Sequence, residues 1–276
     1  MTFEPEQLGQ SRTDLAATLR ELRKRAGLTG DRLARRCNMS QSQISKFETG
    51  KKTPKLIDVE RILRALGAPP GTVEEVTALA RIANTEWQDK RSSWRRGMEK
   101  RQTELASLEG EAAELRYFLP AMITGLLATP EYVRASLTHT PGDSSKTVAR
   151  KLERQAILYD TAKSFTFLLT EQAVRWATVP KSAIAVQIDR LVSLSHLPNI
   201  RIGILPIGTE MARGPMNTFT IYDARLATVE NFTGRMVFRD PRDISEYLAV
   251  FSHFEQRAHF GGEARNLMQQ WADAYR

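Results

Sequence analysis

Residues 40–52, SQSQISKFETGKK, carry a dense set of side chains that donate and accept hydrogen bonds. Glutamine can pair with two atoms on the edge of adenine, and lysine can reach the acceptors of guanine in the major groove. Serine hydroxyls and lysine amines also bind phosphate oxygens. Concentrated on one short segment, these residue types favour contact with double-stranded DNA.

Two sets of candidate contacts follow from this chemistry. The candidate base contacts are amide, hydroxyl and amine side chains within the segment, namely Gln41, Ser42, Gln43 and Lys46. The candidate phosphate contacts are the hydroxyl and basic side chains beside them, namely Ser40, Ser45, Lys51, Lys52, Arg35 and Arg36. For any one of these residues taken alone, a side chain that merely faces water is the simpler interpretation.

Three short helices are expected to position this segment. Residues 14–26 have leucines on one helical face and basic residues opposite, which predicts an amphipathic helix. Thr29 is a suitable N-cap for a second helix, and Asn38 tolerates the left-handed conformation that a tight exit requires. Ser40 can then cap a third helix, whose only apolar side chains face inward.

The third predicted helix has one apolar face and several polar ones. Ile44 and Phe47 are three residues apart and therefore share a face, so the candidate base contacts fall on the other faces. Two short helices joined by a tight turn form the helix-turn-helix plan, in which the second helix lies in the major groove. Gly50 and Pro54 are expected to end this helix.

Two more helices follow and complete a predicted bundle of five helices. In the fourth, Ile57, Ile62, Leu63 and Leu66 are expected to point inward. The predicted domains are a helix-turn-helix domain over residues 1–84, a basic linker or exposed helix with Trp87 and Trp94 over residues 85–114, and an α+β domain over residues 115–276. The fold class is thus an all-α N-terminal bundle plus an α+β domain in which helices alternate with short strands around a small sheet.

Charge is distributed unevenly along the 276 residues. Residues 1–102 contain 21 Lys and Arg against 13 Asp and Glu, whereas residues 103–276 contain 19 of each, so the net charge of +8 lies entirely in the first part. A basic module joined to a neutral one indicates that the first part meets a polyanion. Cys37 is the only cysteine, and no membrane span or signal pattern occurs, which together favour the cytoplasm, with the DNA-bound protein at the nucleoid.

The sequence offers no constellation for catalysis. The four histidines lack zinc-binding spacing, and the phosphate-binding and nucleophile motifs are absent, so we expect no enzyme activity, no metal and no cofactor. A long glycine-containing turn, IGTEMARGPMN, is the best candidate for a ligand or partner loop, through Met211, Arg213 and Met216.

Residues 15–66 resemble the lambda-repressor-like helix-turn-helix module of the xenobiotic-response-element type. The resemblance is carried by LRELRKRAGLTGDRLARRCNMSQSQISKFETGKKTP. It implies base contacts from Gln41, Ser42 and Lys46, and an ion pair between Arg23 and Glu48. The family has glutamine at the start of the second helix, where this sequence has Gly30, so one phosphate contact would be lost.

The rest of the chain resembles the uncharacterised domain that follows this module in WhiJ-type bacterial regulators. The matching stretches include YFLPAMITGLLATPEYVRA, LVSLSHLPNIRIGILPIG and FRDPRDISEYLAVFSHFEQRA. The resemblance implies a transcription regulator, which we expect to act as a homodimer on double-stranded DNA. The alternative is an antitoxin-like protein that captures a small partner protein and autoregulates its own operon.

Overall fold

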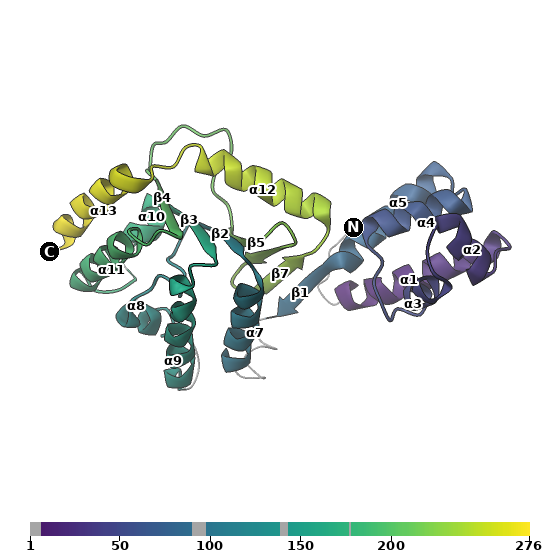
Figure 1. Cartoon of the computed structure of the whole chain (residues 1–276), viewed down its shortest axis with the longest axis horizontal. Helices are drawn as coiled ribbons and strands as arrows, with labels where there is room; N and C mark the ends of the chain where they lie inside the picture. Colours follow the sequence, from purple (N-terminus) through teal and green to yellow (C-terminus); the bar gives the residue numbers. More distant parts are fainter. Residues whose placement is uncertain (1–6, 90–97, 139–142, 177) are drawn as a thin grey trace. The chain divides into compact units, whose positions relative to one another are not determined.

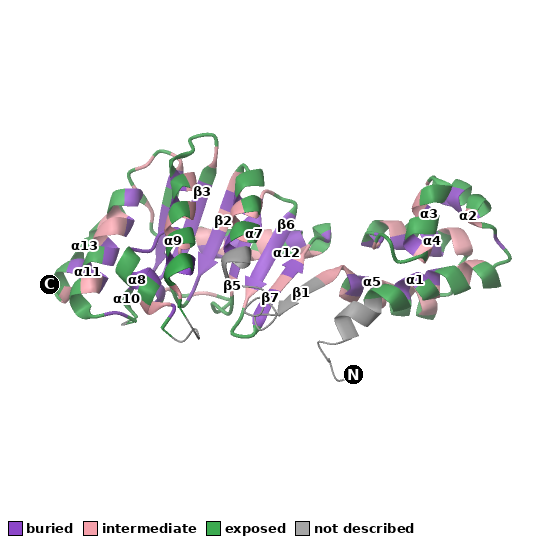
Figure 2. Ribbon diagram, turned by 90° about the horizontal axis from the view of Figure 1, so that it is seen from below, coloured by how far each residue is buried: buried purple, intermediate pink, exposed green. Residues whose placement is uncertain are grey.

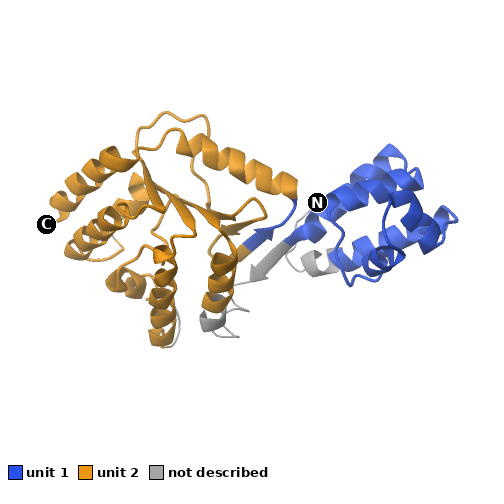
Figure 3. Cartoon of the chain, in the orientation of Figure 1, with its two compact units in different colours: residues 1–87, 236–240 blue, residues 88–235, 241–276 orange. Residues whose placement is uncertain are grey.

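The computed structural model describes residues 7–89, 98–138, 143–176 and 178–276. The chain divides into two compact units (Figure 3). The N-terminal unit contains residues 1–87 with the short stretch 236–240, and the C-terminal unit contains residues 88–235 and 241–276.

The N-terminal unit is an all-α bundle, as the sequence predicted. Its five helices enclose one apolar core, in which Leu15, Leu33 and Phe47 are almost completely buried. The helices are α1 (Gln7–Arg25), α2 (Gly30–Cys37), α3 (Gln41–Glu48), α4 (Leu56–Leu66) and α5 (Pro70–Asn84).

Local capping fixes the turn between α2 and α3. The hydroxyl of Thr29 accepts a hydrogen bond from the amide of Arg32 at 3.2 Å, which starts α2. Asn38 ends α2 in the left-handed conformation, with φ 54°, and Ser40 caps α3 two residues later. The expected caps and the tight exit are therefore confirmed.

One expected core position in α4 is wrong. Ile57 is 54% exposed, whereas its neighbours Leu56 and Val59 are buried with Ile62 and Leu63. The helix begins at Leu56, so the apolar stripe runs through Leu56, Val59 and the Ile62–Leu63 pair at helical spacing. Ile57 lies one residue outside that stripe.

The segment 85–114, expected as a basic linker or exposed helix, contains regular structure. Strand β1 occupies Thr85–Asp89 and helix α7 occupies Met98–Glu111. Helix α7 buries Gln102 and Glu109, so part of it is packed rather than exposed. The side chain of Trp87 and all of Trp94 lie outside the described residues.

The C-terminal unit is built around a mixed sheet. Strands β2, β3 and β4 are parallel neighbours, whereas β5 pairs antiparallel with both β2 and β6. Within this unit the strand order is β6-β5-β2-β3-β4. The strands after β1 are β2 (Glu114–Leu119), β3 (Ser164–Thr170), β4 (Ile200–Leu205), β5 (Thr218–Tyr222), β6 (Leu226–Glu230) and β7 (Gly234–Phe238).

Helices cover both faces of this sheet (Figure 1). Helix α12 lies over one face, and α7 and α9 lie over the other. Helices α11 and α13 pack against each other beside the β4 edge. The remaining bounds are α8 (Pro130–Ala135), α9 (Ser145–Glu153), the 3-10 helix η1 (Arg154–Tyr159), α10 (Glu171–Arg175), α11 (Lys181–Leu194), α12 (Pro241–Glu255) and α13 (Gly261–Tyr275).

Strand β2 contributes to the core on both faces of the sheet, and Figure 2 shows that it is largely buried. Tyr117 stacks on Phe167 with ring centroids 4.8 Å apart. The next residue, Phe118, points to the opposite face and stacks on Phe254 of α12 at 4.4 Å. Burial on both faces explains why β2 ends in three consecutive apolar residues, Tyr117–Leu119.

Asp223 ties the start of β2 to the turn between β5 and β6. It has φ 52°, and its Oδ1 accepts hydrogen bonds from the amides of Ala113 and Glu114, both at 2.9 Å. Burial raises the pKa of Asp223, but these two amides and the guanidinium of Arg225 lower it by more, so the pKa lies below its ordinary value.

We predict that Asp223→Asn lowers the free energy of unfolding of the C-terminal unit at pH 7 by about 1–2 kcal/mol, because charge-assisted hydrogen bonds become neutral ones. A carboxyl with a depressed pKa stabilises the fold above its unfolded pKa and loses that effect as the pH falls through the folded pKa. The difference between wild type and variant should therefore begin to shrink near about pH 4, the ordinary pKa of an aspartic acid, and shrink further as the pH falls through the lower folded pKa. Urea unfolding across pH measures it, and a pH-independent difference would contradict the role given to the carboxylate.

Candidate nucleic-acid interface

Helix α3 presents the candidate base contacts to solvent. Ile44 and Phe47 are each 1% exposed and fix the inner face of the helix in the core. Gln41, Ser42 and Lys46, three of the candidate base contacts, are exposed on the remaining faces, as is the candidate phosphate contact Ser45. The orientation of the helix is thus set by two apolar side chains, and it leaves the amide, hydroxyl and amine groups available for hydrogen bonding.

Ser40 and Gln43 are used differently from the other polar residues. The Ser40 hydroxyl accepts a hydrogen bond from the Gln43 amide at 3.1 Å, and the Gln43 side-chain oxygen accepts one from the Ser40 amide at 3.3 Å. This reciprocal capping box starts α3. Gln43, expected among the base contacts, therefore has its acceptor directed to the helix start.

The basic candidate phosphate contacts lie in the chain segments before and after α3. Lys51 and Lys52 are exposed in the turn after it, and the Lys52 amide donates to the Lys46 carbonyl at 3.1 Å. On α2, Arg35 forms an exposed ion pair with Asp31 at 3.0 Å, and Arg36 is also exposed.

Two exposed basic residues that sequence reasoning did not select lie near these positions in the chain. Arg32 is in the first turn of α2, and Lys55 immediately precedes α4. The sequence signal that could have identified them is a basic residue at the start of a helix, where phosphate groups bind. They are additional candidates for phosphate contacts.

Arg23 and Glu48 join α1 to the end of α3. The Arg23 Nε lies 2.7 Å from Glu48 Oε1, and Nη2 lies 2.8 Å from Oε2, while Nη1 donates to the Leu28 carbonyl at 2.8 Å. The two side chains are 16% and 10% exposed. The hydrogen bond to Glu48 raises the pKa of Arg23, which keeps its guanidinium charged within the bidentate pair.

The start of α2 leaves room beside Gln41. A Cβ placed on Gly30 would lie 3.9 Å from Gln41 Nε2, which is an ordinary van der Waals separation. A side chain at this position would therefore reach the neighbourhood of the candidate base contacts without strain. With glycine there, the Gln41 amide has no side-chain neighbour from residue 30.

The candidate partner loop between β4 and β5 (residues 206–217) is mostly exposed. Met216 is 85% exposed, Met211 is half-buried, and Arg213 donates to Glu246 at 2.9 Å. Arg213 is thus tied to α12 through Glu246, whereas the side chain of Met216 is exposed.

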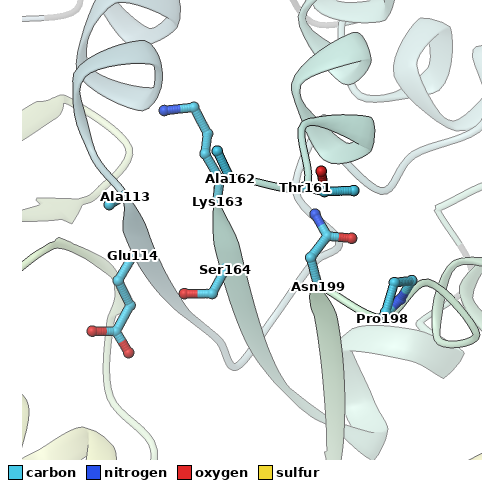
Figure 4. Close-up of a pocket in the computed structure, with 8 residues that line it drawn as sticks. All are labelled: Ala113, Glu114, Thr161, Ala162, Lys163, Ser164, Pro198 and Asn199. Carbon is cyan, nitrogen blue, oxygen red and sulfur yellow. The ribbon is translucent and has the colours of Figure 1, made fainter.

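A shallow hollow of about 480 Å³ lies at the amino ends of the parallel strands (Figure 4). Two of its polar side chains are already engaged: Lys163 Nζ donates to the carbonyls of Gly110 and Ala112, and Asn199 Nδ2 donates to those of Leu158 and Asp160. Ligands of open α/β sheets bind at the opposite, carboxyl end of the strands. The hollow therefore lies at the end of the strands away from the one at which such ligands bind.

The described parts of the chain contain no cluster of three His, Cys, Asp or Glu side chains arranged to hold a metal ion. Within those same ranges, none of the helices has the length and apolar content required of a membrane span.

We predict that Arg23→Met lowers the free energy of unfolding of the N-terminal unit by about 1–3 kcal/mol, since Glu48 would keep a largely buried carboxylate without its partner. The matched control is Arg35→Met, which removes an exposed pair and should change stability by less than about 0.5 kcal/mol. Thermal unfolding followed by circular dichroism compares them. Equal, small effects of both substitutions would argue against a structural role for the Arg23–Glu48 pair.

Two family models match the chain. Residues 14–76 match a helix-turn-helix domain, and residues 102–270 match a family described as a domain of unknown function (DUF5753). No curated protein matches the sequence.

Solved structures give only distant similarities. A phospholipase D family member, Nuc from Salmonella typhimurium, is 7% identical with a TM-score of 0.38, over 64% of this chain and 97% of that one. TrmBL2, an archaeal chromatin protein, is 12% identical with a TM-score of 0.33, over 72% of this chain and 65% of that one. Scores this low indicate neither a shared fold nor a shared activity. The family match covers more than half of the sequence, so the chain belongs to the DUF5753 family and carries a helix-turn-helix domain ahead of that domain.

Proposed function

We propose that the protein is a sequence-specific, DNA-binding transcription regulator of the lambda-repressor-like, xenobiotic-response-element type. The observation that carries the proposal is the arrangement of α3 inside the matched helix-turn-helix domain: its inner face is buried through Ile44 and Phe47, and its polar residues are exposed. An exposed helix of this composition fits the major groove. The excess positive charge of residues 1–102 supports binding to a polyanion.

Within α3, we assign base reading to Gln41, Ser42 and Lys46. These residues belong to the first two turns of the helix, the part that contacts base edges in helix-turn-helix proteins. Gln43 is assigned to the capping box with Ser40, because its side-chain oxygen is already bonded there. The phosphate contacts are assigned to Ser45, Lys51, Lys52, Arg35 and Arg36, with Arg32 and Lys55 as additions.

We predict that Gln41→Ala relaxes preference at one base position and weakens specific binding by about 1–3 kcal/mol, because a bidentate contact to a base edge is lost. Lys51→Ala should instead weaken binding to every duplex alike and reduce the salt slope by about 1. Fluorescence anisotropy at several salt concentrations, with a selected operator and a random duplex, measures both. If the two substitutions weakened binding to both duplexes equally, the reading role of Gln41 would be wrong.

We further propose that the regulator acts as a homodimer through its C-terminal unit. One module of this size buries limited DNA surface, and joining two raises the effective affinity. A two-fold dimer would read half-sites roughly 34 Å apart, one helical turn along the duplex. Such a regulator would act in the cytoplasm, at the nucleoid.

We predict that duplexes with two half-sites one turn apart bind at least about tenfold more tightly than duplexes with an added half turn, which places the second site on the opposite side. Electrophoretic mobility shifts with the full chain test the spacing, and analytical ultracentrifugation gives the oligomeric state. A monomer that binds both spacings with one affinity would contradict the dimer.

The second candidate function is capture of a small partner protein with autoregulation of the operon. It is favoured by the exposure of Ile207 and Met216 on the β4–β5 loop, since flexible methionine-containing surfaces suit protein partners. Co-purification of the full chain from its own cells, beside the variant Met216→Glu, tests it. Loss of a co-purifying small protein in that variant supports partner capture, whereas no such protein with either form counts against it.

A further inference from the structure

Helix α7 is attached to the C-terminal unit mainly through polar groups. Among its described side chains, residues 102–111, the buried ones are Gln102 and Glu109. Leu105, Ala106 and Leu108 are only half-buried. A surface helix is normally held by an apolar stripe that faces the core. The inner face of α7 therefore differs from that of α11, which buries Ile184, Ala185, Gln187, Ile188, Leu191 and Leu194.

Both buried residues of α7 converge on Arg154. Gln102 and Glu109 are seven residues apart, so they lie on one face of the helix, two turns from each other. Arg154 Nε lies 2.9 Å from Glu109 Oε2, Nη2 lies 2.6 Å from Oε1, and Nη1 donates to the side-chain oxygen of Gln102. The Tyr117 hydroxyl donates to Glu109 Oε1 at 3.2 Å. A single guanidinium at the start of η1 thus holds two turns of α7.

A second cation holds the end of the same helix. Lys163, just before β3, donates from Nζ to the carbonyl of Gly110 at 2.7 Å and to that of Ala112 at 2.6 Å. A cation here satisfies carbonyls that the helix leaves unpaired and interacts favourably with the helix dipole. Arg154 and Lys163 both lie outside α7 in the chain. One of these cations holds the inner face of the helix, and the other holds its C-terminal end.

A buried ion pair of this kind fixes the position of α7 but contributes little to the net free energy of folding. Glu109 is 1% exposed and Arg154 is 10% exposed, so both charges lost their hydration when α7 packed. In such buried pairs the desolvation cost offsets most of the Coulombic attraction, whereas buried apolar side chains give a net gain. Elements with few buried apolar contacts open locally at a low free energy.

We propose that α7 is a releasable helix, which separates from the sheet and η1 as one unit when the Arg154–Glu109 pair opens. In the chain, α7 stands between β1 and β2, so its release would lengthen the segment that joins these two strands. The proposal concerns a conformational step within the C-terminal unit. It holds or fails independently of whether the protein binds DNA.

The test is hydrogen–deuterium exchange of the full chain, read by mass spectrometry on peptides from α7 and from α11. In the wild-type protein, amides of residues 102–111 are expected to exchange at least about tenfold faster than those of α11, because α7 opens without global unfolding. Glu109→Gln, which keeps the shape but removes the charge, should speed exchange in α7 at least about tenfold further and leave α11 unchanged.

A double variant tests the opposite change, in which both buried charges are removed together. Glu109→Leu with Arg154→Met exchanges the buried charges for apolar contacts and should slow exchange in α7 about tenfold relative to wild type. The matched control is Arg150→Met, which removes an exposed ion pair with Glu153 on neighbouring α9 and should leave α7 exchange unchanged. If the double variant fails to fold, the comparison of α7 and α11 exchange in wild type and in Glu109→Gln still tests the proposal. Exchange of α7 as slow as that of α11 in wild type, or equal acceleration of both helices by Glu109→Gln, would overturn the proposal.

Discussion

Burial of Ile44 and Phe47 is the constraint on which the N-terminal unit depends. These two side chains seat α3 in the bundle and determine which of its faces meets solvent. The helix has only eight residues, which is too short for stability in isolation, so its position comes from tertiary contacts. The capping box at Ser40 and the Arg23–Glu48 pair hold its two ends. Exposure of the polar side chains is therefore a consequence of core packing, and the proposed reading of DNA follows from it.

The C-terminal unit uses ionic contacts in a different way. Arg154 lies between η1 and α7 with its charge buried, and Asp223 fixes the entry into β2 through two backbone amides. Around them, the aromatic side chains of β2 and β3 and those facing α12 supply the apolar burial that stabilises the sheet. The apolar layer sets the stability of this unit, whereas the charged groups set where its first helix and first parallel strand lie.

The fold class and the short helices around α3 could be predicted because they rest on local signals: caps, turn residues and helical spacing of apolar side chains. Residue type alone did not predict the role of Gln43. The sequence also contains the S-x-x-Q pattern of a capping box, which gives the same side chain an alternative to base contact. Ile57 was misplaced because the buried stripe of α4 runs through its neighbours Leu56 and Val59, which lie at helical spacing from Ile62 and Leu63. Strand β2 alternates over its first four residues only, because Phe118 and Leu119 are buried directly after Tyr117, so periodicity did not reveal it. The Glu109–Arg154 pair joins residues 45 positions apart, which no local pattern encodes.

The most direct measurement of the central claim is side-chain amide NMR of the full chain with a duplex selected from random sequences. The account predicts that the Gln41 side-chain NH₂ resonance shifts on binding the selected duplex. It should shift less on a duplex changed at one base pair. The backbone amide resonances of Ile44 and Phe47 should change little, because both residues stay in the core. A selected duplex that leaves the Gln41 resonance unmoved, or that perturbs only residues outside α3, would contradict the account.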